Sequence, residues 1–232
     1  MSPAAIDLID QAQRASIAGT KAAKSLLHHA LCLQEQAGGY YNEGTSRVYF
    51  LMAWHHYERK HFLAALTYFL QCLRISIELY GLEHCTTQLV LDDIRDLLED
   101  MNLNEDCVNP VFDSWTLQDM ALDGENDHET KTNGRTEEYW QKALHLIPAD
   151  LDLERARIFI HLAQIYQKKS QTEQALSYFC QALMILPRWY KQDHPQLISL
   201  KNQAQHVASS LTPMVPRSPI SSTSNQAISI IH

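Results

Sequence analysis

ARIFIHLAQIYQKKSQTEQALSYFCQALMILP, residues 156–187, contains two short apolar patterns joined by a polar turn. The first pattern has helical spacing and consists of Phe159, Leu162, Ala163 and Tyr166. The second consists of Ala175, Phe179 and Ala182, followed by Pro187. Two helices approach closely only where small residues meet, so Ala163 and Ala175 predict a tight antiparallel hairpin. The proline ends the second helix because it has no N–H to donate.

The second half of this segment has two earlier counterparts in the chain. Its apolar set, with Leu183 added, recurs 110 positions earlier as Ala65, Phe69, Cys72 and Leu73. A further 42 positions earlier it recurs as Ala23, Leu27, Ala30 and Leu31. We therefore expect three second helices, with residues 45–57 as the first helix of the middle hairpin and residues 4–36 as an N-terminal helix pair. On 45–57 the expected packing residues are Tyr49, Met52, Ala53 and His56.

This recurrence resembles the tetratricopeptide (TPR) repeat, a helical hairpin with alanine and aromatic residues at fixed offsets. The segments 75–84 and 185–194 extend two of the second helices by equal lengths, and they match Tyr80 with Tyr190 and His84 with His194. Such ends are similar to the repeat subtype of kinesin light chains, although Cys85 stands where that subtype has proline. The resemblance covers about residues 45–90 and 156–205, and it implies that each histidine stabilises its turn by a hydrogen bond.

The remaining segments extend the array. Residues 86–101 are expected to form the first helix of another repeat, and 137–148 a second helix whose partner is either degenerate or the apolar segment 109–122. Residues 195–211 have one apolar side and suit a terminal capping helix. The expected fold is all-α, a superhelical array of antiparallel helical hairpins (a TPR-like α-solenoid). We divide it into N-terminal repeats (1–122), an acidic or polar disordered insertion (123–136), C-terminal repeats (137–211) and a disordered Ser/Pro-rich tail (212–232).

Composition narrows the class of protein. The chain has 232 residues, 45% of them hydrophobic, without a run of 18 consecutive apolar residues or the start of a signal peptide. These features predict a cytoplasmic protein without a membrane span. The five cysteines are scattered, so we expect most of them to be buried thiols. A net charge of −8 disfavours nucleic acid as a partner. Residues 83–129 hold 14 acidic residues and one basic residue, a composition more typical of a solvated, mobile segment than of a binding surface.

No arrangement of residues in the sequence indicates catalysis. Glycines are dispersed and form no phosphate-binding loop, and no nucleophile elbow is present. The histidine pairs His28–His29 and His55–His56 point about 100° apart on a helix and cannot easily share a metal ion. We therefore expect no catalytic residue, no cofactor and no metal, and we treat a histidine-based metalloenzyme as a remote alternative.

Peptide binding is the sharper hypothesis, because first helices of stacked TPR hairpins line the concave side of the array. On 45–57, the side opposite the packing residues carries Arg47, Phe50, Leu51, Trp54 and Tyr57. This aromatic stripe could hold a partner peptide, with the arginine facing an acidic group. The alternative is that the N-terminal helix pair, 4–36, covers the stripe.

The last hairpin offers a second candidate surface. The corresponding side of its first helix is polar and mildly basic, and its candidate partner-binding residues are Arg157, His161, Gln164 and Lys168. Such groups recognise acidic or amidic ligands through charge-assisted hydrogen bonds, but an ordinary solvated helix face has the same composition. The expected function is a non-enzymatic scaffold or adaptor that binds a partner peptide in the TPR groove. The alternative is an accessory helical domain that acts through self-association or as a regulatory subunit.

Overall fold

The computed structural model describes residues 3–17, 22–126 and 133–211. These residues form helices and connecting turns, and no β-strand lies among them. The all-α prediction is therefore confirmed for this part of the chain. The fold divides into two compact units, Met1–Cys107 (unit 1) and Val108–His232 (unit 2), which are described separately.

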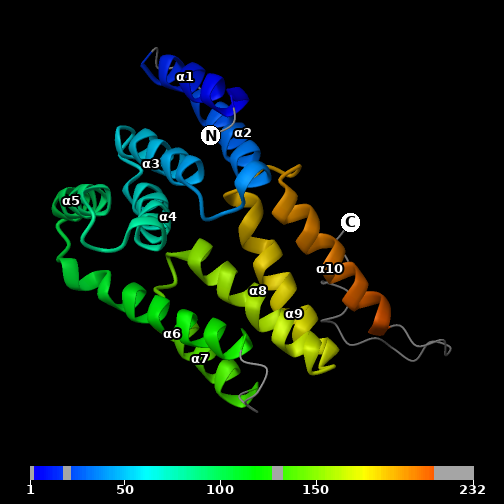
Figure 1. The fold of residues 1–232 in the computed structure, drawn as a ribbon. Helices are drawn as coiled ribbons and strands as arrows, with labels where there is room; N and C mark the ends of the chain where they lie inside the picture. Colours follow the sequence, from blue (N-terminus) through cyan, green and yellow to red (C-terminus); the bar gives the residue numbers. More distant parts are fainter. Residues whose placement is uncertain (1–2, 18–21, 127–132, 212–232) are drawn as a thin grey trace. The chain divides into compact units, whose positions relative to one another are not determined.

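Unit 1 consists of successive helices that each pack against the next one along the chain (Figure 1). They are α1 (Pro3–Ile17), α2 (Ala22–Gly38), α3 (Glu43–Tyr57), α4 (Phe62–Tyr80) and α5 (Cys85–Asp100). The expected N-terminal helix pair is confirmed as α1 and α2, and the middle hairpin as α3 and α4. The single helix expected over 86–101 is α5.

The α3–α4 hairpin forms the core of unit 1 because its facing sides are apolar. The four residues predicted to pack on α3 are all buried: Tyr49, Met52, Ala53 and His56. Asn42 caps the helix, since its Oδ1 accepts a hydrogen bond from the Thr45 N–H at 2.9 Å. At the turn between the helices, Lys60 adopts a positive φ of 58°.

Helix α4 has the length and apolar character of a membrane-spanning helix. An 18-residue window within it has a mean hydropathy of 1.4, but 67% of that window is buried inside the protein. Because α3 and α5 both pack against α4, its apolar residues are the core of the unit. Burial of this kind accounts for the composition of α4 without a membrane.

Unit 2 repeats the same arrangement of neighbouring helices (Figure 1). Its α-helices are α6 (Asn109–Asn126), α7 (Asn133–Leu146), α8 (Asp152–Lys168), α9 (Thr172–Ile185) and α10 (Pro195–Leu211). α6 packs against α7, so the segment beginning at Asn109 is the partner of the second helix that ends before Pro148. α10 packs against α9 with Leu197, Leu200, Ala204 and Val207 buried, as expected of a capping helix.

Two segment boundaries differ from those expected. The chain divides between Cys107 and Val108 rather than after residue 122, because the apolar side of α6 packs on α7. Of the stretch 123–136, expected as a disordered insertion, residues 123–126 end α6 and residues 133–136 begin α7. Residues 127–132 and the tail 212–232 lie outside the described residues.

The α8–α9 hairpin matches the pattern from which the fold was predicted. Ala163, Ala175 and Ala182 are completely buried, and the two helices pack closely. Pro187 lies in a short 3-10 helix, Leu186–Arg188, directly after α9. The next residue, Trp189, donates its indole N–H to Asp152 Oδ1 at 2.7 Å, which ties the end of the hairpin to the start of α8.

The matched turns after α4 and α9 share a ring contact. Tyr80 and His84 lie 4.8 Å apart by ring centroids, and Tyr190 and His194 lie 4.3 Å apart. His84 also caps α5, because its Nδ1 accepts a hydrogen bond from the Thr86 N–H at 3.2 Å. At His194 the backbone N–H makes the turn bond, to the Lys191 carbonyl at 3.0 Å. The two sequence matches therefore share the ring contact, whereas the hydrogen bonds of the two histidines differ.

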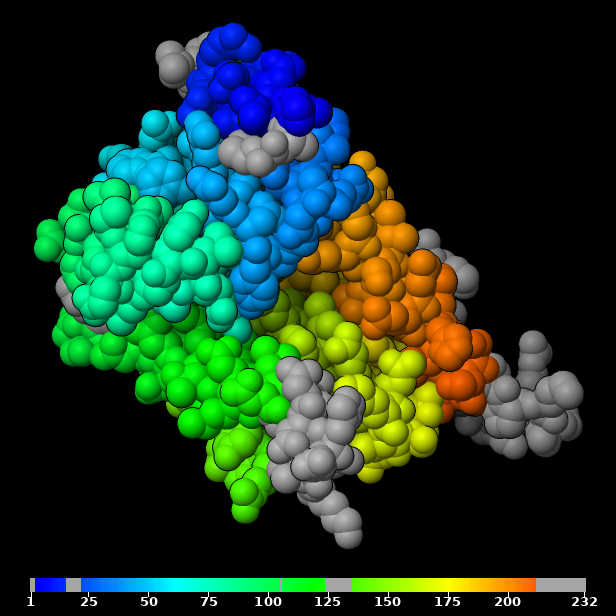
Figure 2. All heavy atoms as spheres, in the orientation of Figure 1, coloured from blue at the N-terminus to red at the C-terminus, as the bar shows by residue number. Residues whose placement is uncertain are grey.

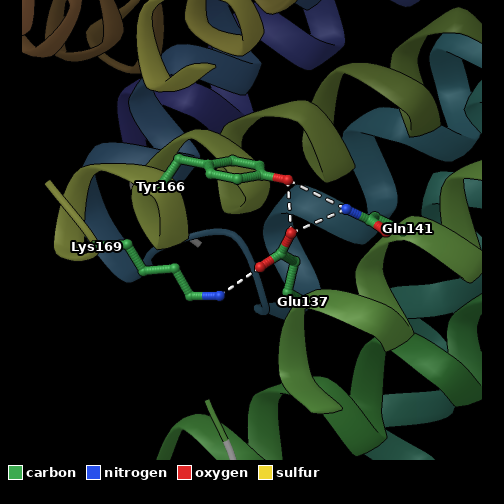
Figure 3. A network of polar contacts seen from close by, with 4 residues as sticks. All are labelled: Glu137, Gln141, Tyr166 and Lys169. Atoms are coloured by element: carbon green, nitrogen blue, oxygen red, sulfur yellow. Dashed lines mark hydrogen bonds and ion pairs between the residues drawn. The ribbon is translucent and has the colours of Figure 1, made fainter. Parts of the chain in front are cut away.

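A polar network joins the two hairpins of unit 2 (Figure 3). Glu137 Oε1 of α7 accepts hydrogen bonds from the Tyr166 hydroxyl at 2.6 Å and from Gln141 Nε2 at 3.0 Å, while Oε2 forms an ion pair with Lys169. Burial alone would raise the pKa of Glu137, but the bonds from Lys169 and Tyr166 outweigh it and lower that pKa. Burial and the bond to Glu137 raise the pKa of Tyr166 to about 12. The network thus links α7 to the end of α8.

Candidate protein-binding surface

The stripe on α3 forms a connected aromatic surface. Phe50, Trp54 and Tyr57 are half-buried, and Arg47 is exposed. The Trp54 ring lies 6.4 Å from Phe50 and 5.2 Å from Tyr57 by centroids. Phe69 of α4 packs against both Phe50 and Trp54, with its ring centroid 5.9 Å from that of Phe50 and 6.0 Å from that of Trp54. Edge-to-face contacts of this kind hold the rings in place.

A pocket of about 660 Å³ opens beside this stripe, within unit 1. Leu51, Trp54 and His55 of α3 line it, together with Glu58 directly after that helix. Ala12 and Gln13 of α1 and Leu27 of α2 complete the lining. The N-terminal helix pair therefore forms one wall of a pocket at the stripe. The sequence left open whether the stripe is free to bind a peptide or is covered by this helix pair. In the structure the pair borders the stripe and leaves a cavity there.

On its other side the stripe meets α5. The Tyr57 hydroxyl donates a hydrogen bond to Asp100 Oδ2 at 2.5 Å, and that bond, with burial, raises the pKa of Tyr57. Trp54 donates a hydrogen bond to Asp93. Burial and the charges of Asp96 and Asp92 nevertheless raise the pKa of Asp93. Trp54 thus lies between the pocket and the carboxylates of α5.

These carboxylates are the part of the surface that the sequence analysis missed. Asp93, Asp96 and Asp100 follow one another at i, i+3 and i+7, so they share one side of α5. The helix itself was predicted, and its Val90, Ile94, Leu97 and Leu98 are buried, but its acidic residues were interpreted as solvated rather than as a binding surface. The helical spacing of the aspartates was the signal that could have identified them.

In the space-filling view, atoms of α2 to α5, coloured from blue to green, form one continuous surface (Figure 2). Arg95 of α5 forms an ion pair with Asp92. No basic residue of the described ranges forms an ion pair with Asp93, Asp96 or Asp100. The side of α5 next to the aromatic stripe therefore carries negative charge.

The second predicted set lies on α8 of unit 2. His161 stacks face to face on the buried Trp140 of α7, with centroids 4.2 Å apart and ring planes at 7°. Arg157 and Gln164 are half-buried, and Lys168 is exposed at the end of the helix. The stacking gives His161 a packing role that its sequence position did not reveal.

The histidine clusters do not form a metal site in the described residues. No group of three His, Cys, Asp or Glu side chains there is placed to hold a metal ion. His55 contacts Arg59, whose Nη1 lies 3.0 Å from its Nδ1, and His56 stacks on Tyr68 with centroids 5.4 Å apart. Both rings are parts of the α3–α4 hairpin.

Comparison with known proteins supports the repeat assignment. Residues 156–187 match the family model for the tetratricopeptide repeat. No curated protein is similar enough to count as a match.

Solved structures with a detectable likeness include two of a putative kinesin light chain with nearly identical TPR-like repeats from Podosopora anserina, one of them a variant with a single substitution. Their sequences are 12% and 11% identical to this one, and each has a TM-score of 0.38. Each match covers 100% of this chain and 95% of the chain in the solved structure. Another is BtubC from P. vanneervenii, at 13% identity and a TM-score of 0.25 over 94% of each chain.

The family match falls on α8 and α9, the hairpin whose buried alanines and aromatic residues have the expected spacing. Repeats of this family support a role in protein–protein interaction. The chain therefore contains a tetratricopeptide repeat, which is formed by α8 and α9.

Proposed function

We propose that this chain is a non-enzymatic scaffold or adaptor, and that it binds a segment of a partner protein on the aromatic side of α3. The pocket lined by Leu51 and Trp54 carries this proposal. Its volume of about 660 Å³ can accept large apolar side chains of a partner. Tryptophan and tyrosine are also the residues that most often dominate binding energy at protein interfaces.

The structure of the stripe supports its use as a preformed surface. Phe50, Trp54 and Tyr57 contact one another and Phe69, so little side-chain freedom is left to lose on binding. We include Arg157, Gln164 and Lys168 of α8 as a second, polar contact surface. His161, which is half-buried and stacks on Trp140, completes this second surface.

Site-specific photo-cross-linking tests the proposal. A benzophenone amino acid in place of Leu51 should cross-link a partner protein in cells, and Trp54→Ala in the same chain should abolish that product. The matched control places the same group at Leu63, which is 42% exposed on α4 and does not line the pocket. Equal products from both positions would reject the pocket as the binding surface. A product joining two copies of this chain would instead support the self-association alternative.

A further inference from the structure

We infer that the segment bound at α3 is cationic, with lysine or arginine side chains placed against α5 and an apolar side chain in the pocket. This inference rests on the proposed function and specifies the chemistry of its partner. It also reverses the expectation that Arg47 would select an acidic peptide, because carboxylates accept hydrogen bonds from Trp54 and Tyr57 of the stripe.

The first observation is where the carboxylates lie. Tyr57 and Trp54 donate hydrogen bonds to Asp100 and Asp93, so both carboxylates lie directly beside the aromatic stripe. Asp96 lies between them on the same side of α5 and is exposed. A ligand that reaches Trp54 therefore comes within range of three carboxylates.

The second observation is that these charges oppose one another. The pKa of Asp93 is raised by burial and then by the neighbouring Asp96 and Asp92. A cation beside these groups would relieve the repulsion, while an acidic ligand would increase it. The available basic residue of α5, Arg95, already pairs with Asp92 at the edge of the group.

The third observation is the combination of aromatic and acidic groups. A lysine or arginine side chain can place its charge near carboxylates while its methylene groups lie along apolar rings. Tryptophan and tyrosine rings also attract cations through their π faces. The pocket next to Trp54, bordered by Leu27 and Leu51, provides space for an apolar residue of the same segment.

The test uses two synthetic helical peptides of equal length and equal leucine and tryptophan content, one rich in lysine and the other in glutamate. Binding to the full chain is measured by isothermal titration calorimetry at two salt concentrations. We expect the lysine peptide to bind about tenfold more tightly, with a difference that shrinks at high salt. Asp93→Asn/Asp100→Asn should weaken binding of the lysine peptide by about three- to tenfold.

The matched control is Glu78→Gln/Glu83→Gln. It removes the same number of charges from exposed positions at the end of α4 and in the turn that follows, outside the proposed surface, and it should leave binding unchanged. Equal loss in the two double variants, equal affinity for the two peptides, or no binding of the lysine peptide would overturn the inference. In each of these cases the cross-linking result at Leu51 decides the proposed function independently.

Discussion

Tyr57 and Asp100 are 43 residues apart in sequence, yet the tyrosine hydroxyl lies 2.5 Å from the aspartate Oδ2. This bond connects the end of α3 to the end of α5 and places a carboxylate beside the aromatic stripe. Tyr57→Phe keeps the ring contacts with Trp54 and Phe62 and removes only the donor. We expect it to lower the free energy of unfolding by about 0.5–1.5 kcal/mol in urea denaturation. Tyr41→Phe, at a 45% exposed tyrosine, is the control and should have no effect.

The tight contact between α8 and α9 predicts that a larger side chain at this contact destabilises the protein. Ala163 is completely buried in this hairpin, so Ala163→Leu must push the helices apart. We expect a loss of about 1–3 kcal/mol in the free energy of unfolding. Gln174→Leu, which adds a leucine at an exposed position on α9, should cost little. If the two substitutions had equal effects by chemical denaturation, the close approach of the helices would be refuted.

His56 predicts a dependence of stability on pH. Its ring is buried against Tyr68, and neither ring nitrogen has a hydrogen-bond partner among the described residues. Burial, followed by the charges of Lys24 and of the neighbouring histidines, lowers the pKa of His56 from 6.5 to about 3. The unfolded chain therefore binds a proton between these two values that the folded chain does not. Stability contributed by neutral His56 is present above pH 6.5 and is lost as the pH falls towards 3.

The change attributed to His56 should approach about 1.4 kcal/mol per pH unit within this window. Burial likewise lowers the pKa of His194 to about 4, so it adds a similar dependence in unit 2. His56→Phe should flatten the plot of unfolding free energy against pH, measured by urea denaturation at a series of pH values. A variant with the same slope as the wild type would show that His56 accepts a proton without cost.

The network around Glu137 predicts that replacing this glutamate lowers the free energy of unfolding more than replacing its neighbour Glu138. Glu137→Gln removes the charge that pairs with Lys169, and it should lower the free energy of unfolding by about 1 kcal/mol. Because the folded pKa of Glu137 is lowered, this contribution is present above the unfolded pKa and is lost as the pH falls through the folded pKa. Glu138→Gln, which breaks an exposed pair with Lys142, should have a smaller effect. Thermal or chemical denaturation of both variants measures the difference.

The helices and their pairing could be predicted from the sequence because they depend on local spacing. Ala163 and Ala175 predicted a close hairpin, and the offsets of 110 and 42 identified the other second helices. The match between Tyr80 and Tyr190 extended to their contacts with histidine, since helix and turn are short-range structures. The aromatic stripe on α3 was predictable for the same reason.

What the sequence could not supply were contacts between helices distant along the chain. Gln13 of α1 and Leu27 of α2 line the pocket at Trp54, but their spacing gives no indication of where α1 lies. The stacking of His161 on Trp140 depends on how one hairpin packs on the next. The spacing of the aspartates on 86–101 likewise does not show that α5 places Asp93 and Asp100 beside the aromatic stripe of α3.

Trp54 lies at the pocket and beside Asp93 at once, and it is the single tryptophan in residues 1–107 of the sequence. The light that an indole emits depends on the polarity and charge around it. A segment that enters the pocket would displace water from one side of this ring and bring a new charge to the other. Its contribution to the emission of the unlabelled protein, which adds to that of Trp115, Trp140 and Trp189 in unit 2, would therefore change when the pocket is occupied.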